Sequence, residues 1–138
     1  MKLNKAQNYA VAAMVQIAAV QIAANQSQKP LSAVAICERV SLPLSFLQQL
    51  LRELTNAGLV ESRQGRHGGF KLARPAKQIA LFDIVDAVKG GLKSEPVEIV
   101  GLDIGSAKTV QRAVDASNAS IRKEFKAITL ADLRAAKA

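Results

Sequence analysis

The sequence predicts a mainly α-helical fold with a small β-hairpin, in which a winged helix-turn-helix domain precedes a long C-terminal helix. Apolar residues recur three or four positions apart over several segments, which is typical of amphipathic helices. Two stretches that alternate apolar and polar residues, LVESR and FKLAR, enclose the glycine-rich tract QGRHGG and predict a two-stranded hairpin. Alanine is abundant and aromatic residues make up only 4% of the chain, so helices can pack closely.

The first two helices are predicted from their capping residues and their apolar spacing. Asn4 can cap a helix that runs to about Ala24, and Ser32 can cap a second one over residues 33–40. The polar run NQSQKP separates them, because Pro30 disfavours helical backbone at the residue before it, Lys29. The stripe of the first helix consists of Tyr9, Ala10, Ala13, Met14, Ile17 and Val20.

The turn and the third helix complete a helix-turn-helix. Ser41-Leu42-Pro43 predicts a tight turn, and a helix over residues 44–57 ends at Gly58. The hairpin that follows directly makes this unit a winged helix. Because an isolated hairpin is only marginally stable, apolar residues are expected to anchor it on the helices, namely Leu59, Val60, Phe70 and Leu72.

The C-terminal half is predicted to hold a short helix, a loop and a long helix. The short helix covers residues 81–88 and stops at Gly90-Gly91, and residues 91–107 show no helical period. A long helix from about Lys108 to Ala127 carries one apolar face. That face is too long for an isolated helix, so it packs either over the N-terminal domain or against its copy in a second subunit.

Charge indicates a polyanionic partner. The net charge is +8 and the sequence pI is near 10.0. Residues 1–74 hold nine Lys and Arg against three Asp and Glu, whereas the rest is nearly balanced. The partner is a nucleic acid or an anionic membrane surface, unless the charge serves solubility. No stretch approaches the roughly 18–20 apolar residues of a membrane span, and no signal peptide is evident, so a cytoplasmic protein without a membrane partner is expected.

Catalysis and cofactor binding find little support in the residues. One cysteine excludes an intrachain disulfide, and one cysteine with one histidine offers no nucleophile–base pair or metal cluster. The tract GRHGG is too short and isolated to be a nucleotide-binding fingerprint. The sequence therefore predicts a protein that is not an enzyme and that holds no metal or cofactor.

Several tracts resemble the Rrf2 family of transcription regulators. These are MKLNKAQNYAVAAM at the start, SLPLSFLQQLLRELTNAGLVESRQGRHGGFKLARP from the turn to the wing, IALFDIVDAVKG, and ITLADL near residue 130. Order and spacing both agree from the turn to the wing. The resemblance implies a homodimer that crosses through its long helices and binds a partly palindromic operator.

The resemblance also implies a division of the chain. Residues 1–90 form the winged helix-turn-helix DNA-binding domain, 91–107 a loop, and 108–138 the dimerisation helix and C-terminal tail. The dimerisation residues are Val110, Val114, Ile121, Phe125 and Ile128. Many members hold an iron–sulfur cluster with three cysteines in the loop, but here GGLKSEPVEIVGLDIGSAK has no cysteine or histidine. The better functional comparison is thus with cluster-free members.

The start of the third helix is the candidate for reading bases in the major groove. Gln can pair bidentately with adenine, and Ser can reach a phosphate or a base. Phe46 is either a core residue or a contact to a thymine methyl, the glutamines are either base readers or solvated, and Arg52 is expected to meet phosphate. The candidates are Ser41, Pro43, Ser45, Phe46, Gln48, Gln49 and Arg52.

The hairpin tip is the candidate minor-groove contact. Many relatives carry arginine where this chain has Gln64, so Arg63 or Arg66 is expected to take its place in a narrow, electronegative groove. His67 is a candidate hydrogen-bond donor to a DNA phosphate. The glycines permit a tight turn and let the backbone come close to the sugar-phosphate chain. A flexible solvated hairpin is the alternative. The candidates are Arg63, Gln64, Gly65, Arg66, His67 and Gly68.

Other candidates lie outside these two elements. Lys2, Lys5 and Tyr9 resemble family positions that face the DNA backbone, and Lys71 and Arg74 are further candidates for phosphate contacts. Each lysine is otherwise simply solvated. For Cys37 the simpler interpretation is a small buried core residue, and the alternative is a thiol redox switch beside the DNA-reading helix.

The sequence thus predicts a sequence-specific DNA-binding regulator, a repressor, that acts as a homodimer on double-stranded DNA without an iron–sulfur cluster. A small-molecule or protein effector would bind near residues 91–107 and the long helix. The alternative is a winged-helix protein-interaction module that has lost specific DNA binding. The basic wing favours the regulator.

Overall fold

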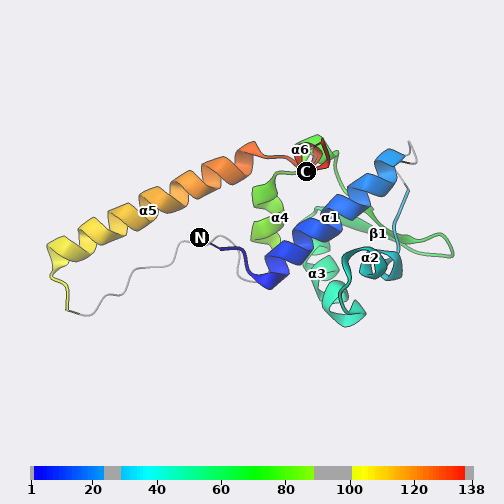
Figure 1. The fold of residues 1–138 in the computed structure, drawn as a ribbon, viewed down its shortest axis with the longest axis horizontal. Coiled ribbons are helices and arrows are strands. Elements are labelled where there is room, and N and C mark those ends of the chain that lie inside the picture. Colours follow the sequence, from blue (N-terminus) through cyan, green and yellow to red (C-terminus); the bar gives the residue numbers. More distant parts are fainter. Residues whose placement is uncertain (1, 24–28, 89–100, 136–138) are drawn as a thin grey trace.

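A computed structural model describes residues 2–23, 29–88 and 101–135, and its winged-helix fold confirms the predicted fold class (Figure 1). The molecule has two parts. The body consists of the described residues up to Val88 together with residues 128–135, and the arm is the single helix α5, which projects from the body. The elements are α1 (Lys5–Ala23), α2 (Ala33–Val40), α3 (Leu44–Asn56), β1 (Val60–Arg63), β2 (Gly69–Leu72), the 3₁₀ helix η1 (Ala76–Gln78), α4 (Leu81–Ala87), α5 (Ile104–Ala127) and α6 (Leu130–Ala135).

Helix α1 is the centre of the body. Asn4 begins it as predicted: its Oδ1 accepts from the Gln7 backbone N–H at 2.8 Å, and the Gln7 Oε1 accepts from the Asn4 N–H at 2.9 Å. Small buried side chains, Ala10 and Ala13 among them, let neighbouring elements approach closely. As a result α1 contacts α2, α3, α4, α6 and β2.

Helices α2 and α3 form the predicted helix-turn-helix. The Ser32 Oγ accepts from the Ala35 N–H at 3.2 Å, and α2 ends at Ser41, which has a left-handed backbone (φ 53°). Gly58, at φ 77°, follows the end of α3 as expected. One face of α3 is buried in the core, contributing about 1.5–3 kcal/mol of transfer free energy per leucine; it comprises Leu47, Leu50, Leu51 and Leu54.

The wing is an antiparallel hairpin that hydrogen bonds tie to α1 and to the segment before α2. Its register pairs Val60 with Leu72 and Arg63 with Gly69. Leu31, just before α2, exchanges two backbone hydrogen bonds with Phe70, at 2.8 and 2.9 Å. The Gln21 Oε1 of α1 accepts from the Leu72 N–H at 2.8 Å. Of the four predicted apolar anchors, Leu59, Val60 and Leu72 are buried in the core, and Phe70 is half-buried and packs against it.

Gly69 is required where the wing meets the segment before α2. Its φ of 146° lies in a region that side chains rarely adopt. A Cβ at this position would stand 2.6 Å from the carbonyl carbon and oxygen of Leu31. The close approach that allows the Leu31–Phe70 bridge thus depends on glycine.

The C-terminal residues return to the body, which the sequence did not predict. Thr129 bridges Ala80, and two backbone hydrogen bonds of 2.8 Å join Leu81 to Ile128 and Leu130 to Ile79. Instead of the expected tail, α6 follows and packs on α1, with Leu130 fully buried. Ile128, expected on the long helix, has extended backbone and ends it.

The arm begins earlier than predicted. Asp103 caps α5, its Oδ1 accepting from the Ser106 N–H at 2.6 Å, so the helix starts at Ile104 rather than near Lys108. The first part of the predicted loop, residues 91–100, lies outside the described residues. In α5, all of which is described, no residue is buried.

Within the described ranges, no helix has the length and apolar character that a membrane span requires.

The arm meets the body at its C-terminal end, where α5 contacts α4. There the Lys126 Nζ lies 4.9 Å from the centre of the Phe82 ring, and the Arg122 guanidinium carbon lies 5.9 Å from it. The other end of α5 extends away from the body (Figure 1).

Candidate nucleic-acid interface

The polar residues predicted on the DNA-reading helix lie on the outside of the body. The apolar face of α3 turns inward, so the opposite face and the preceding turn are left to solvent. Exposed here are Ser41, Pro43, Ser45, Gln48, Gln49 and Arg52. The structure therefore brings these predicted residues to one continuous stretch of surface from the turn to the middle of α3.

The first turn of α1 joins this surface. The Tyr9 and Phe46 rings meet edge to face, with centroids 5.7 Å apart. The Lys5 Nζ lies 5.9 Å from the centre of the Tyr9 ring and 6.0 Å from that of Phe46. Phe46 is half-buried against the core, in line with the core interpretation. Lys5 thus places a positive charge beside the start of α3, and Lys2 is exposed nearby in the chain.

A short hydrogen-bonded chain runs along the outer face of α3. The Arg52 Nη2 donates to the Gln49 Oε1 at 2.7 Å, and the Gln49 Nε2 donates to the Glu53 Oε1 at 3.4 Å. The spacing i, i+3, i+4 puts the three side chains on one helical face. The sequence predicted roles for Gln49 and Arg52 but none for Glu53, because a glutamate directly before the core residue Leu54 gives no signal of its own.

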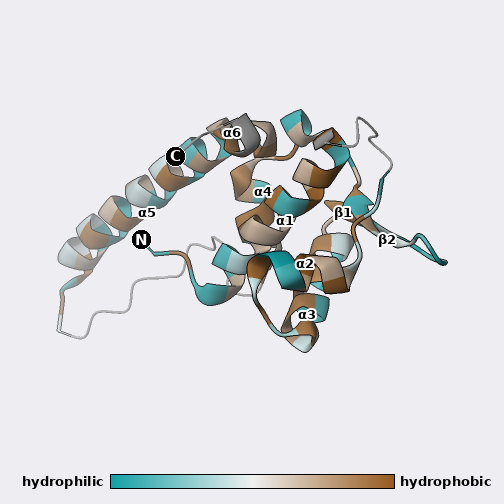
Figure 2. Ribbon diagram, turned by 45° about the vertical axis from the view of Figure 1, so that its right-hand side comes forward, coloured by the Kyte–Doolittle hydropathy of each residue, from teal (hydrophilic) through white to brown (hydrophobic). Residues whose placement is uncertain are grey.

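The tip of the wing is polar and exposed (Figure 2). Gly65 has φ 104°, which favours glycine, and a Cβ there would meet no neighbouring atom, so the turn conformation rather than crowding calls for glycine. At Gly68 a Cβ would stand 2.2 Å from the Arg63 carbonyl oxygen, so this glycine closes the hairpin. Arg63, Gln64, Arg66 and His67 are all exposed, as a contact to DNA requires.

A groove connects the two candidate contact elements. It has a volume of about 460 Å³ and lies between the outer face of α3 and the wing. Its lining consists of Gln48, Leu51, Arg52, Thr55, Asn56, Ser62 and Phe70. Of the predicted major-groove residues, Gln48 and Arg52 therefore lie across one concave surface from Ser62 and Phe70, on the two strands of the wing.

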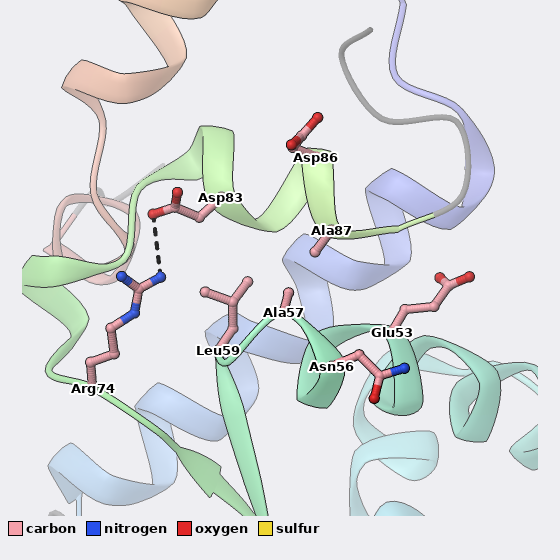
Figure 3. Close-up of a pocket in the computed structure, with 8 residues that line it drawn as sticks. All are labelled: Glu53, Asn56, Ala57, Leu59, Arg74, Asp83, Asp86 and Ala87. Carbon is pink, nitrogen blue, oxygen red and sulfur yellow. Dashed lines mark ion pairs between the residues drawn. The ribbon is translucent and has the colours of Figure 1, made fainter.

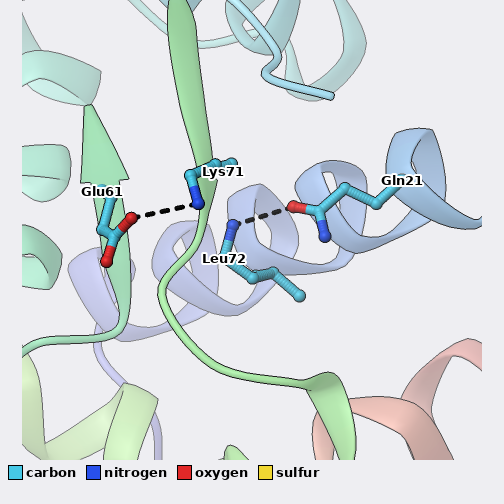
Figure 4. Close-up of polar contacts among 4 residues, drawn as sticks. All are labelled: Gln21, Glu61, Lys71 and Leu72. Atoms are coloured by element: carbon cyan, nitrogen blue, oxygen red, sulfur yellow. Dashed lines mark hydrogen bonds and ion pairs between the residues drawn. The ribbon is translucent and has the colours of Figure 1, made fainter. Parts of the chain in front are cut away.

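Lys71 does not belong to that surface. Its side chain is 11% exposed, and its Nζ pairs with the Glu61 Oε2 at 3.1 Å across the hairpin (Figure 4). The strand pattern could not reveal this pairing, because alternation gives the face of a residue but not the partner of its charge. This placement removes Lys71 from the candidate interface.

Arg74 is likewise engaged within the body. Its Nη2 lies 3.6 Å from the Asp83 Oδ2, which also accepts from the Ala80 N–H at 2.9 Å and so caps α4. The two residues line a second, open pocket of about 460 Å³ between the end of α3, the base of the wing and α4 (Figure 3). Glu53, Asn56, Leu59 and Asp86 complete much of its lining.

Cys37 is half-buried and packs against the core from α2. Its placement fits the structural interpretation better than that of an exposed sensor.

Cys37 is the chain's one cysteine, and among the described residues no three His, Cys, Asp or Glu side chains come together as a metal site would need. An iron–sulfur cluster needs several thiolate ligands. The donor set of this chain does not fit one.

The chain matches known proteins over nearly its whole length. The sequence profile of the Rrf2 family, described as iron-dependent transcriptional regulators, matches residues 3–136. The HTH-type transcriptional regulator IscR of Cereibacter sphaeroides is 39% identical over 89 residues, which are 64% of this chain and 56% of the relative. The Mycobacterium tuberculosis protein named HTH-type transcriptional regulator Rv1287 is 33% identical over 137 residues, covering 96% of this chain and 81% of that protein. The matches to several other curated relatives span about half of their length.

Solved structures share the fold. CymR, the global cysteine regulator of Bacillus subtilis, superposes with a TM-score of 0.75 at 26% identity, covering 100% of this chain and 99% of that one. IscR of T. potens gives a TM-score of 0.71 at 33% identity, covering 96% and 85%. A helix-turn-helix with an exposed polar reading face, a basic wing beside it, and a family profile that spans almost every residue lead to one assignment. The chain belongs to the Rrf2 family of transcriptional regulators and has a winged-helix fold.

Proposed function

We propose that this protein is a repressor that binds a partly palindromic operator as a homodimer and recognises its sequence without an iron–sulfur cluster. The observation that carries the proposal is the groove between the exposed face of α3 and the strands of the wing, whose exposed tip carries Arg63 and Arg66. Two such surfaces related by a two-fold axis match the two half-sites of an inverted repeat.

Each part of the surface has a role in the proposed complex. The start of α3 enters the major groove, where Gln48 and Gln49 face base edges and Ser45 reaches a phosphate or a base. The wing tip places Arg63 or Arg66 in the minor groove. Lys2, Lys5 and Arg52 contact phosphates and fix the register of the protein on the duplex.

The arm is the proposed dimer contact. Its apolar face stays partly open to solvent, and Ile104 is 77% exposed. A helix of 24 residues with an apolar face and no buried residue needs a partner to cover it. A second copy of the arm supplies the matching face, with Val110, Val114, Ile121 and Phe125 at the contact.

We further propose that the protein works by binding rather than by catalysis, in the cytoplasm. A small-molecule or protein effector near the end of α4 and the arm would change the spacing of the two wings. The open pocket beside α4 in Figure 3 reaches Ala87, one residue before the described part of the body ends at Val88. It therefore lies close in sequence to the expected effector region.

Selection of bound sequences from random duplex DNA, at two salt concentrations, tests this function. We expect an enriched inverted repeat and an affinity that falls steeply with salt, because bound lysines and arginines release counterions from DNA. The double variant Arg63→Ala, Arg66→Ala should weaken binding, whereas Lys71→Ala, which removes a lysine paired with Glu61 within the hairpin, should leave the salt slope unchanged. Salt-sensitive binding without a motif would instead favour the protein-interaction module.

A further inference from the structure

We propose that Glu53 is a positioning residue for DNA recognition: it holds one amide N–H of Gln49 and so makes that side chain accept adenine and reject guanine. Arg52 supports it from the other side of the amide. The inference rests on the proposed function, since it assumes that α3 enters the major groove. It goes further because it assigns base preference to a residue that need not touch DNA.

Two hydrogen bonds of the Gln49 amide define its orientation. Arg52 offers only donors, and at 2.7 Å it faces the amide oxygen. Glu53 offers only acceptors, and at 3.4 Å it faces the amide nitrogen. Turning the amide over would set donor against donor and acceptor against acceptor. Arg52 and Glu53 therefore fix the positions of the amide oxygen and the amide nitrogen of Gln49.

The remaining hydrogen-bonding capacity decides the base. An amide oxygen has two lone pairs and the NH₂ group has two hydrogens. With one of each engaged within α3, Gln49 retains one acceptor site and one N–H. Adenine presents one acceptor, N7, and one donor, the N6 amino group, whereas guanine presents two acceptors, N7 and O6. The amide thus satisfies adenine, but guanine would need both hydrogens, one of which Glu53 holds.

The position of Glu53 suits an indirect role. It lies one turn after Gln49 on α3, is half-buried, and lines the pocket on the side toward α4 (Figure 3). A carboxylate there would be repelled by DNA phosphates if it projected to the duplex. Glu53 is therefore expected to weaken the overall affinity for DNA while it strengthens the preference for adenine.

Sequence selection with matched variants tests the proposal. Glu53→Ala removes the acceptor, Glu53→Gln keeps an acceptor without the charge, and Glu38→Ala removes one exposed negative charge from α2 as a control. In Glu53→Ala the ratio of adenine to guanine at the base that Gln49 faces should fall about three- to tenfold, a part of what one bidentate pair contributes. Glu53→Gln should keep that ratio close to the wild-type value, and Glu38→Ala should not alter it.

A measurement without DNA tests the contacts of Gln49 independently of the proposed function. In nuclear magnetic resonance spectra of the free protein, the two side-chain N–H signals of Gln49 should shift in Glu53→Ala and Arg52→Ala, but not in Glu38→Ala. Arg52→Ala also keeps the test available if Glu53→Ala does not fold. A wild-type motif whose adenine-to-guanine ratio is the same in Glu53→Ala overturns the inference alone. A wild-type protein that enriches no motif overturns the proposed function, and with it this inference.

Discussion

The body and the arm are both helical, but different contacts stabilise them. In the body, residues such as Met14, Ile17 and Leu47 are fully buried, and α1 contacts most of the other elements. The arm has a good N-terminal cap at Asp103 and an apolar face, yet no residue in it is buried. Similar local signals thus give a packed helix in one region and an uncovered one in the other. The helices of the body and the arm thus differ in whether other elements pack on their apolar faces, not in helix propensity.

The largest effect is expected from removing a body contact that the sequence did not predict. Leu130→Ala truncates a fully buried side chain on α6 and should lower the free energy of unfolding by about 2–5 kcal/mol. Val34→Ala, at a position of α2 that is 56% exposed, should change it by less than about 0.5 kcal/mol. Urea denaturation measures both. Equal effects would mean that α6 does not belong to the body.

The arm should respond through assembly instead of folding. Val114→Glu puts a carboxylate on the proposed dimer face and should weaken dimerisation about a hundredfold, since a buried charge without a partner is costly. Ala116→Glu introduces the same charge on the opposite side of α5, where the residue is exposed, and should leave the dimer intact. Sedimentation over a range of protein concentrations distinguishes them. A wild-type monomer at micromolar concentration would contradict the arm's proposed role.

The junction between the two regions should give a smaller effect. Lys126→Gln removes the cation 4.9 Å from the Phe82 ring and should destabilise the contact of α5 with α4 by about 0.5–1 kcal/mol. Lys123→Gln removes the same charge from a neighbouring exposed position and serves as the control. Hydrogen exchange of amides in the last turns of α5 reports the difference. Identical exchange in the two variants would assign no stabilisation to the ring contact.

The smallest effect concerns pH at the start of the arm. The Ser106 backbone N–H, then its hydroxyl, hold the pKa of Asp103 below its ordinary value. Because the folded pKa is the lower one, the ionised cap stabilises the first turn above the unfolded value of about 3.9, and this is lost as pH falls through the folded pKa. The Ser106 amide should therefore lose protection from exchange in acid. Asp103→Asn should abolish this dependence, and the Ala35 amide, capped by Ser32, should not show it.

Most of the body could be predicted because its signals are local. Ser32, Gly58 and the apolar spacing of α3 each act within one helix turn, and all were confirmed. Helix α6 was missed because its six residues are too few to show a period, and only the distant surface of α1 explains why they fold. The start of α5 was missed because Asp103 lies between Gly101 and Gly105, and glycines this close together suggest a loop.

The candidate site was less predictable than the fold. Residue type and helix position placed Gln48, Gln49 and the wing arginines on the exposed surface, and their contacts to DNA stay predictions. The partners of charged side chains depend on neighbours that sequence spacing does not fix. That is why Lys71 was assigned to the interface although it pairs with Glu61, and why Glu53 was not considered.

The packing of α6 on α1 has a consequence for synthesis of the protein. A ribosome makes α1 first, but more than one hundred residues separate its last residue, Ala23, from Leu130. At roughly 5–20 residues per second, the apolar side of α1 that receives α6 waits on the order of 5–20 seconds for its cover. During that interval the nascent chain exposes a surface that chaperones can bind, and α3 is made before the body that supports it is complete.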